Sequence, residues 1–121
     1  MRIKKIKIGI KDLKTALREF AERADAIERG ETVKKETGVY FTSFEAFRKI
    51  LTPKRLELLH IIKIQKPSSI NELARMAKRD VKNVAEDVKY LEQTGLIEKK
   101  ETDNKTAPVT KYDRIALEIA V

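Results

Sequence analysis

The chain has 121 residues, of which 41% are hydrophobic and 38% charged, and it has no cysteine. This length suits one domain, or one domain with an extension, and argues against a two-domain enzyme with a cleft between its domains. The lack of cysteine excludes disulfides, thiolate zinc sites and thiol catalysis. No apolar run approaches the roughly 18 residues needed to span a bilayer, so we expect no membrane partner.

The net charge of +8 is unevenly distributed. Residues 1–67 have 17 Lys or Arg against 9 Asp or Glu, whereas residues 68–121 have 10 of each. Such an excess attracts a polyanion such as nucleic acid, although it is also typical of a solvated surface. Abundant Lys, Glu and Ile resemble the composition of proteins from hot environments. The N-terminal MRIKKIKIGIKD has lysines between its isoleucines, unlike a secretion signal, so we expect a cytoplasmic protein.

Residues 1–42 predict a strand, a helix and a second strand. The first strand shows the two-residue alternation of Ile6, Ile8 and Ile10 with Lys5, Lys7 and Gly9. Asp12 can then cap a helix that ends at Gly30. Gly38 to Phe41 predict a short extended piece. The helix has an apolar stripe, which either pairs two copies or packs on the first strand within one copy: Leu13, Ala16, Leu17, Phe20, Ala21, Ala24 and Ile27.

Two helices are predicted next. Ser43 can cap a helix over Phe44, Phe47 and Ile50. Thr52 places a capping hydroxyl before a proline at the first helical position, which predicts a helix over residues 53–65.

Two more helices follow in close succession. Ser69 and Glu72 fit a capping box, in which each side chain bonds the other's backbone amide, and this predicts a helix that ends at Lys78. Only one residue separates that end from Asp80, which can cap a last helix that stops at Gly95.

The remaining pattern completes the predicted fold. Strand, turn and strand follow from Leu96, although the polar residues 102–106 do not fix the turn type. The alternating tail Ile115, Leu117 and Ile119 can pair with the first strand. Three short helices followed by a hairpin form the winged variant of the helix-turn-helix. We therefore predict an α+β protein with a winged helix-turn-helix core at residues 43–121. Residues 1–42 form a strand-helix-strand extension for dimerisation or partner binding.

The last predicted helix has two distinct faces. Its packing face has the apolar residues Val81, Val84, Ala85, Val88 and Leu91. Its outer face, which is available to the DNA major groove, has Lys82, Asn83, Glu86, Lys89 and Tyr90.

The segment from Thr52 to about Lys100 resembles the winged-helix core of the MarR-like transcriptional regulators. Together with the preceding Leu51 it reads LTPKRLELLHIIK, then PSSINELARMAKRDVKNVAEDVKYLEQTGLIEKK. The flanks FTSFEAFRKI and YDRIALEI are similar to those of small archaeal and bacterial regulators, some of which occur as antitoxins beside a toxin. The resemblance implies a regulator that binds double-stranded DNA. We expect a homodimer because operator sites are commonly palindromic.

Carried over to this chain, the resemblance implies a set of DNA contacts. Arg79, Lys82 and Asn83 approach base edges or phosphates at the start of the last helix. Ser68 and Ser69 lie near a phosphate that free amides of the preceding helix can bind. The remaining contacts are basic residues of the last helix and of the wing: Lys89, Lys99, Lys100, Lys105 and Lys111.

One departure weighs against DNA binding. Positions 85 and 86, often Ser or Thr followed by Arg in such helices, are Ala85 and Glu86. Glu86 and Asp87 would repel phosphate, and residues 80–94 have four acidic residues against two lysines. A winged helix can also bind proteins alone. The alternative function is therefore a protein-interaction module, such as an antitoxin-like partner of a toxin, and shape-based RNA binding is a third hypothesis.

Three further groups of residues have simpler interpretations. His60, the only histidine, is predicted to be a packed or edge-of-core side chain. Tyr40, Phe41, Phe44 and Phe47 are predicted to fill the joint between extension and core. The lysines at positions 4, 5, 7 and 11 either contact phosphate or face solvent on an edge strand. No motif indicates a catalytic residue, a metal site or a cofactor, so we do not expect an enzyme.

Overall fold

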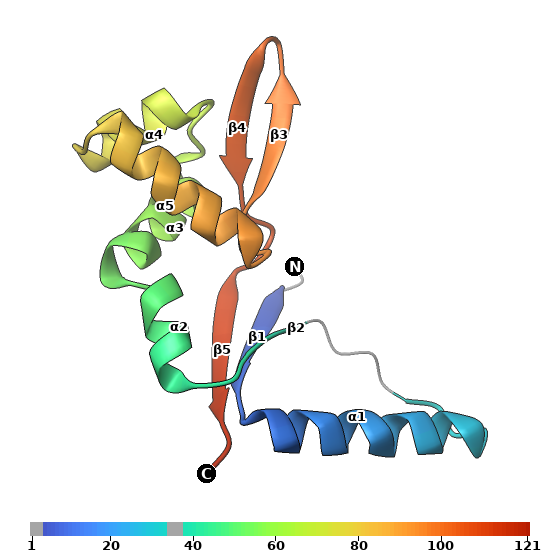
Figure 1. Cartoon of the computed structure of the whole chain (residues 1–121). Coiled ribbons are helices and arrows are strands. Elements are labelled where there is room, and N and C mark those ends of the chain that lie inside the picture. Colours follow the sequence, from blue (N-terminus) through green and yellow to red (C-terminus); the bar gives the residue numbers. More distant parts are fainter. Residues whose placement is uncertain (1–3, 34–37) are drawn as a thin grey trace.

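The computed structural model describes residues 4–33 and 38–121. It has a three-stranded sheet, which lies beside a helical core with a hairpin (Figure 1). The α+β class and the winged helix-turn-helix core with its strand-helix-strand extension are confirmed. In chain order the elements are β1 (Lys5–Ile10), α1 (Leu13–Glu28), β2 (Gly38–Phe41), α2 (Phe44–Ile50), α3 (Pro53–Gln65), α4 (Ile70–Ala77), α5 (Val81–Gln93), β3 (Glu98–Thr102), β4 (Lys105–Val109) and β5 (Arg114–Ile119).

The helix starts follow from capping side chains. The side-chain oxygens of Asp12, Ser43, Thr52, Ser69 and Asp80 each accept a hydrogen bond from a backbone amide in the first turn of the helix that follows. Each bond satisfies an amide that has no partner within its helix. All five predicted caps are therefore confirmed.

The main core lies between α3, α4 and α5. Its buried side chains are Leu58, Ile61, Ile62, Leu73, Ala74, Val84, Val88, Leu91, Leu96 and Ile97, with Ile6 from β1. The apolar face predicted for α5 is confirmed at Val84, Val88 and Leu91, whereas Val81 and Ala85 are exposed. This packing fixes which side of α5 points outward.

The wing is the antiparallel pair β3 and β4, with Thr102 opposite Lys105. Asp103 and Asn104 connect the strands, and both have positive φ, 44° and 65°. Two such residues make a type I′ turn, which matches the twist of the strands. The structure thus fixes the turn type, which the sequence left open. Figure 1 shows the hairpin beside α4 and projecting beyond the helical core.

The second sheet has the order β2-β1-β5, and all its strands are parallel. Ile8 lies opposite both Val39 and Leu117, so the predicted pairing of the tail with the first strand is confirmed. The sheet therefore combines strands from both sides of the predicted boundary at residues 42 and 43. Ile6, Ile8 and Ile10 are buried on its apolar face.

The lysines of β1 do not lie on an edge strand, so that interpretation is wrong: β1 is central in the sheet. Lys7 Nζ lies 3.1 Å from Glu118 Oε2 on β5. Lys11 pairs with Glu19 of α1 and lies over the Tyr40 ring at 4.0 Å. Both lysines therefore contact groups of this chain, and their contact with phosphate stays a prediction.

The predicted aromatic joint is confirmed only in part. Phe41 and Phe47 are half-buried, with ring centroids 5.8 Å apart in an edge arrangement. Tyr40 and Phe44 are 42% and 48% exposed, so they do not fill a core. Tyr40 lies instead against Gly9, where a methyl group would approach its ring to 2.6 Å.

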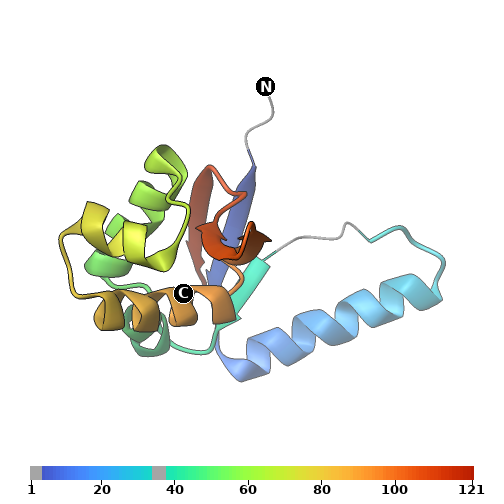
Figure 2. The ribbon, with the colours of Figure 1, turned by 90° about the horizontal axis from the view of Figure 1, so that it is seen from above.

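Helix α1 projects away from the sheet and from the helical core. Figures 1 and 2 show it on the opposite side of the sheet from α2 to α5. None of its residues is buried. Packing of its stripe on the first strand is therefore contradicted. No helix in residues 4–33 or 38–121 is long and apolar enough to cross a membrane.

Candidate nucleic-acid interface

A short turn joins α4 to α5. Lys78 ends α4 in the left-handed conformation with φ 55°, and the Arg79 amide donates to the Ala74 carbonyl at 3.0 Å. Asp80 then begins α5 by accepting from the amides of Lys82 and Asn83 at 3.1 and 3.2 Å. Two capped helices joined in this way are the defining unit of a helix-turn-helix.

The outer face of α5 is open to solvent near its start. Lys82, Asn83, Glu86 and Lys89 are exposed, as the sequence predicts. Tyr90 is half-buried, with the Arg55 guanidinium 4.2 Å from its ring centroid. Tyr90 is therefore engaged within the protein, and four polar residues remain on the outer face.

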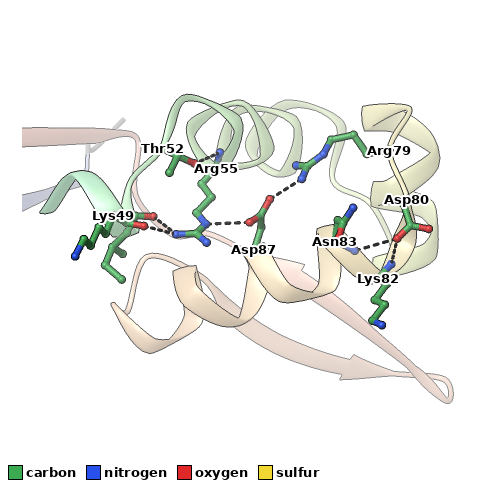
Figure 3. Close-up of polar contacts among 9 residues, drawn as sticks. Lys49, Thr52, Arg55, Arg79, Asp80, Lys82, Asn83 and Asp87 are labelled. Carbon is green, nitrogen blue, oxygen red and sulfur yellow. Dashed lines mark hydrogen bonds and ion pairs between the residues drawn. The ribbon is translucent and has the colours of Figure 1, made fainter. Parts of the chain in front are cut away.

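Asp87 lies between two arginines rather than on that face (Figure 3). Its Oδ1 accepts from Arg55 Nε at 3.0 Å, and its Oδ2 accepts from Arg79 Nη2 at 2.8 Å. The three side chains are only 11–22% exposed. Two positive charges of the protein therefore compensate the charge of Asp87 at close range, and its repulsion of phosphate stays a prediction.

Both arginines have structural partners. Arg55 Nη1 also donates to the carbonyls of Lys49 and Ile50 at the end of α2, each at 2.8 Å. Arg79 Nη1 is buried without a hydrogen-bond partner among the described residues. Arg79 thus holds α5 to the preceding turn, and its contact with DNA stays a prediction.

The start of α4 differs from the predicted capping box. Ser69 Oγ accepts from the Glu72 amide at 3.1 Å, as expected. The Glu72 carboxylate, however, accepts from Ser68, at 2.9 Å from its hydroxyl and 3.4 Å from its amide. These bonds hold the pKa of Glu72 below its ordinary value, and the charges of Arg75 and Lys105 lower it further. The predicted phosphate site at Ser68 is therefore occupied by a carboxylate of the chain itself.

The wing lysines fall into two pairs. Lys99 Nζ lies 3.8 Å from Glu92, and Lys111 Nζ lies 3.5 Å from Glu98. Lys100 and Lys105 are exposed and form no ion pair within residues 4–33 and 38–121. Of the four predicted lysines, these two are the most available to an external phosphate.

Sequence reasoning missed two basic residues at the end of α4. Arg75 and Lys78 are exposed and line a hollow at the α4–α5 turn together with Asn71, Arg79 and Asp80. They widen the positive surface beside α5. Helical spacing from the capped start of α4 was the available signal, since positions 71, 75 and 78 recur at three and four residues.

The other candidate residues do not form a chemical site. His60 is exposed and lines a hollow at the edge of the core, so of its two predicted placements the structure has the edge-of-core one. No group of three His, Asp or Glu side chains in the described part of the chain is placed to hold a metal ion. The expected lack of a catalytic residue or cofactor stays a prediction.

The chain matches a family model and resembles a solved structure. Residues 50–117, more than half of the chain, match the sequence model of the HVO_A0114 family. The fold is similar to the crystal structure of the predicted DNA-binding transcriptional regulator from E. coli, with a TM-score of 0.50 and 19% identity. That match covers 82% of this chain and 84% of the E. coli chain. No curated protein matches the sequence significantly.

Proposed function

The chain belongs to the HVO_A0114 family, and we propose that it is a transcriptional regulator that binds double-stranded DNA through α5 and the wing. The E. coli protein that shares its fold is a predicted DNA-binding transcriptional regulator, which supports this choice. In the proposed complex α5 enters the major groove and the hairpin follows the flanking backbone. We propose no catalytic activity for this chain.

One observation carries the proposal: around the exposed face of α5 lie polar and basic side chains that form no ion pair with any other described residue. Lys82, Asn83 and Lys89 point outward on the helix, and Lys100 and Lys105 do so on the wing. Of the two acids that oppose DNA binding in the sequence, Asp87 is compensated by two arginines, whereas Glu86 stays exposed on α5. Asn can read adenine and Lys guanine in the major groove, while wing lysines contact phosphate.

The finer proposal is a MarR-like regulator that binds a palindromic site as a homodimer. A two-fold symmetric pair of winged helices would present two α5 helices to successive turns of the major groove. Within each copy, Ser68, Ser69 and Lys111 would support the contacts of α5 through the backbone. A phosphate near Ser68 requires displacement of the Glu72 carboxylate.

Fluorescence anisotropy tests the proposal, with the DNA upstream of the protein's own gene and a scrambled duplex at several salt concentrations. We expect the native site to bind roughly a thousandfold more tightly than the scrambled duplex. Replacing Lys82 and Asn83 together by alanine should remove most of this preference. The charge-matched control is Arg48→Ala on α2, because Arg48 is 63% exposed and lies outside α5, the wing and α1.

The outcomes separate three cases. Specific binding that is lost in the double variant and kept in the control supports a regulator that reads bases with α5. Equal, salt-sensitive binding to both duplexes indicates backbone recognition alone. No binding at low salt overturns the proposal.

The second candidate is a protein-interaction module, such as an antitoxin-like partner of a toxin. Two features favour it: the exposed apolar stripe of α1, and the excess of acidic residues within 80–94. Co-purification of the tagged chain with the product of a neighbouring gene tests this function. Failure to recover a stoichiometric partner would count against it.

A further inference from the structure

The apolar face of α1 has no partner within the described chain. Leu13, Leu17, Phe20 and Ile27 are 59–73% exposed, and no residue of the helix is buried. Most of the stability of a helix in a protein comes from the packing of its apolar face, so a partner that covers this face would stabilise α1. The spacing of the apolar residues along α1 indicates what kind of surface this partner presents.

The large and small residues of the stripe follow a heptad pattern. Leu13, Leu17, Phe20, Ala24 and Ile27 are separated by four, three, four and three residues, which is the spacing of a seam between two helices. Ala16 and Ala21 flank this seam, and small side chains there let a second helix approach closely. We propose that α1 pairs with α1 of a second copy of this chain, and that the two helices run antiparallel.

Charge favours the antiparallel direction. Residues 13–20 have two basic side chains and one acidic, whereas residues 21–28 have three acidic and one basic. An antiparallel pair places the positive half of each helix beside the negative half of the other, and opposes the two helix dipoles. A parallel pair would place like charges together.

The available area suits a weak to moderate dimer. The four exposed side chains offer on the order of 100 Å² each, hence roughly 400–500 Å² for each copy. The pair would then bury roughly 800–1,000 Å², at or just below the lower limit of about 1,000 Å² for a specific interface. We therefore expect a monomer-dimer equilibrium in the micromolar range.

The inference deepens the proposed homodimer, and its test needs no DNA. Sedimentation equilibrium of the full chain should give a mass that rises from 13.9 kDa towards twice that value with concentration. Phe20→Glu should keep the protein monomeric, because a charge at the centre of the seam has no partner. The matched control is Ile64→Glu on α3, since Ile64 is 65% exposed and Phe20 is 73% exposed.

A monomeric mass for the unaltered chain at about 100 μM would overturn the pairing. A dimer that persists in Phe20→Glu would do the same, because it would place the interface elsewhere. A cooperative unfolding transition like that of the unaltered chain establishes that the core of this variant is folded, even where the unpaired α1 loses helical signal. Loss of the dimer with DNA binding retained would separate this inference from the proposed function.

Spin labels on introduced cysteines test the relative direction of the two α1 helices. The chain has no native cysteine, so each label attaches only to the introduced residue. Glu22→Cys and Arg29→Cys lie seven residues apart, so both labels are equally offset from the seam. In an antiparallel pair the distance between the two labels at position 29 should exceed that at position 22 by roughly 10 Å. Equal distances would overturn the antiparallel arrangement.

Discussion

Arg55 of α3 and Asp87 of α5 are joined by an ion pair in which Nε and Oδ1 lie 3.0 Å apart. Their side chains are 11% and 15% exposed, and Arg79 pairs with the second carboxylate oxygen of Asp87 at 2.8 Å. One carboxylate therefore fixes α5 both to the first helix of the core and to the turn before it. The pair sets the position of the helix that we propose to enter DNA.

Replacement of Asp87 by alanine should destabilise the fold. The change leaves two largely buried guanidinium groups without their shared counter-charge, which costs about 2–3 kcal/mol in the free energy of unfolding. Urea denaturation measures the loss directly. Specific DNA binding should weaken as well, because α5 loses its anchor.

Glu86 provides the matched control, because it is the adjacent carboxylate and is exposed. Glu86→Ala should change stability by less than about 0.5 kcal/mol. It should also tighten DNA binding, since a negative charge leaves the outer face of α5. Equal destabilisation by the two substitutions would show that the arginine contacts of Asp87 do not stabilise the fold.

Removal of two wing charges should change the salt dependence of DNA binding. Lys100→Gln combined with Lys105→Gln should reduce the slope of log affinity against log salt by about two, because each lost phosphate contact removes roughly 0.9. Anisotropy titrations from low to moderate salt measure that slope. Both lysines are exposed, so the thermal midpoint of unfolding should stay the same.

Lys99 and Lys111 allow a comparison within the same wing. Each has a glutamate partner of its own, at 3.8 and 3.5 Å. Their double replacement by glutamine should reduce the slope less, because the glutamates already compensate part of their charge. An equal reduction for both pairs would contradict the distinction between free and paired wing lysines.

Local signals predicted most of the fold, and long-range contacts account for the differences. Caps such as Thr52 and Asp80 act within one helical turn, so the sequence shows both partners of the bond. Arg55 and Asp87 are 32 residues apart, and no local pattern links them. Glu72 shows a smaller failure of the same kind, since its carboxylate bonds one residue earlier than the capping box predicts.

The sequence also did not predict the position of β1 within the sheet. Alternation of Ile6, Ile8 and Ile10 predicts a strand with one buried face, but it does not give the number of its neighbours. Central placement follows from pairing with β2 and β5 together. For α1 the pattern indicated an apolar stripe, and only the structure shows that the stripe is not used within one copy.

Low pH should weaken the contacts through which Asp113 connects the three-stranded sheet to the helical core. Lys63 Nζ lies 2.8 Å from Asp113 Oδ1, and the Lys4 amide donates to Oδ2 at 2.9 Å. The hydrogen bond from Lys63 lowers the pKa of Asp113 most, below its ordinary value of 3.8, and the bond from the Lys4 amide lowers this pKa further. A depressed pKa in the folded state contributes stability above the unfolded pKa, and this contribution is lost as the pH falls towards the folded pKa.

We therefore expect Asp113→Asn to unfold at a lower temperature than the unaltered protein at pH 5–7. The difference in midpoint should shrink as the pH falls below about 4, where Asp113 becomes protonated in the unfolded state. Thermal unfolding at pH 7, 5, 4 and 3 measures it. A difference that is constant over this range would contradict the assignment.

Gly95 and Gly30 share a conformation but differ in what their helices contact. Both have φ of 80° at the end of a helix, and an added methyl group would meet no atom within 4 Å at either site. Alanine at Gly95 should cost about 1 kcal/mol, because the left-handed conformation disfavours a side chain and α5 is part of the core. Gly30→Ala should cost less than about 0.5 kcal/mol in core unfolding when measured on the monomer, since no residue of α1 is buried.

Urea unfolding at low micromolar protein compares the two variants. An equal loss at both sites would mean that α1 unfolds together with the core, and would contradict its independence from the rest of the copy.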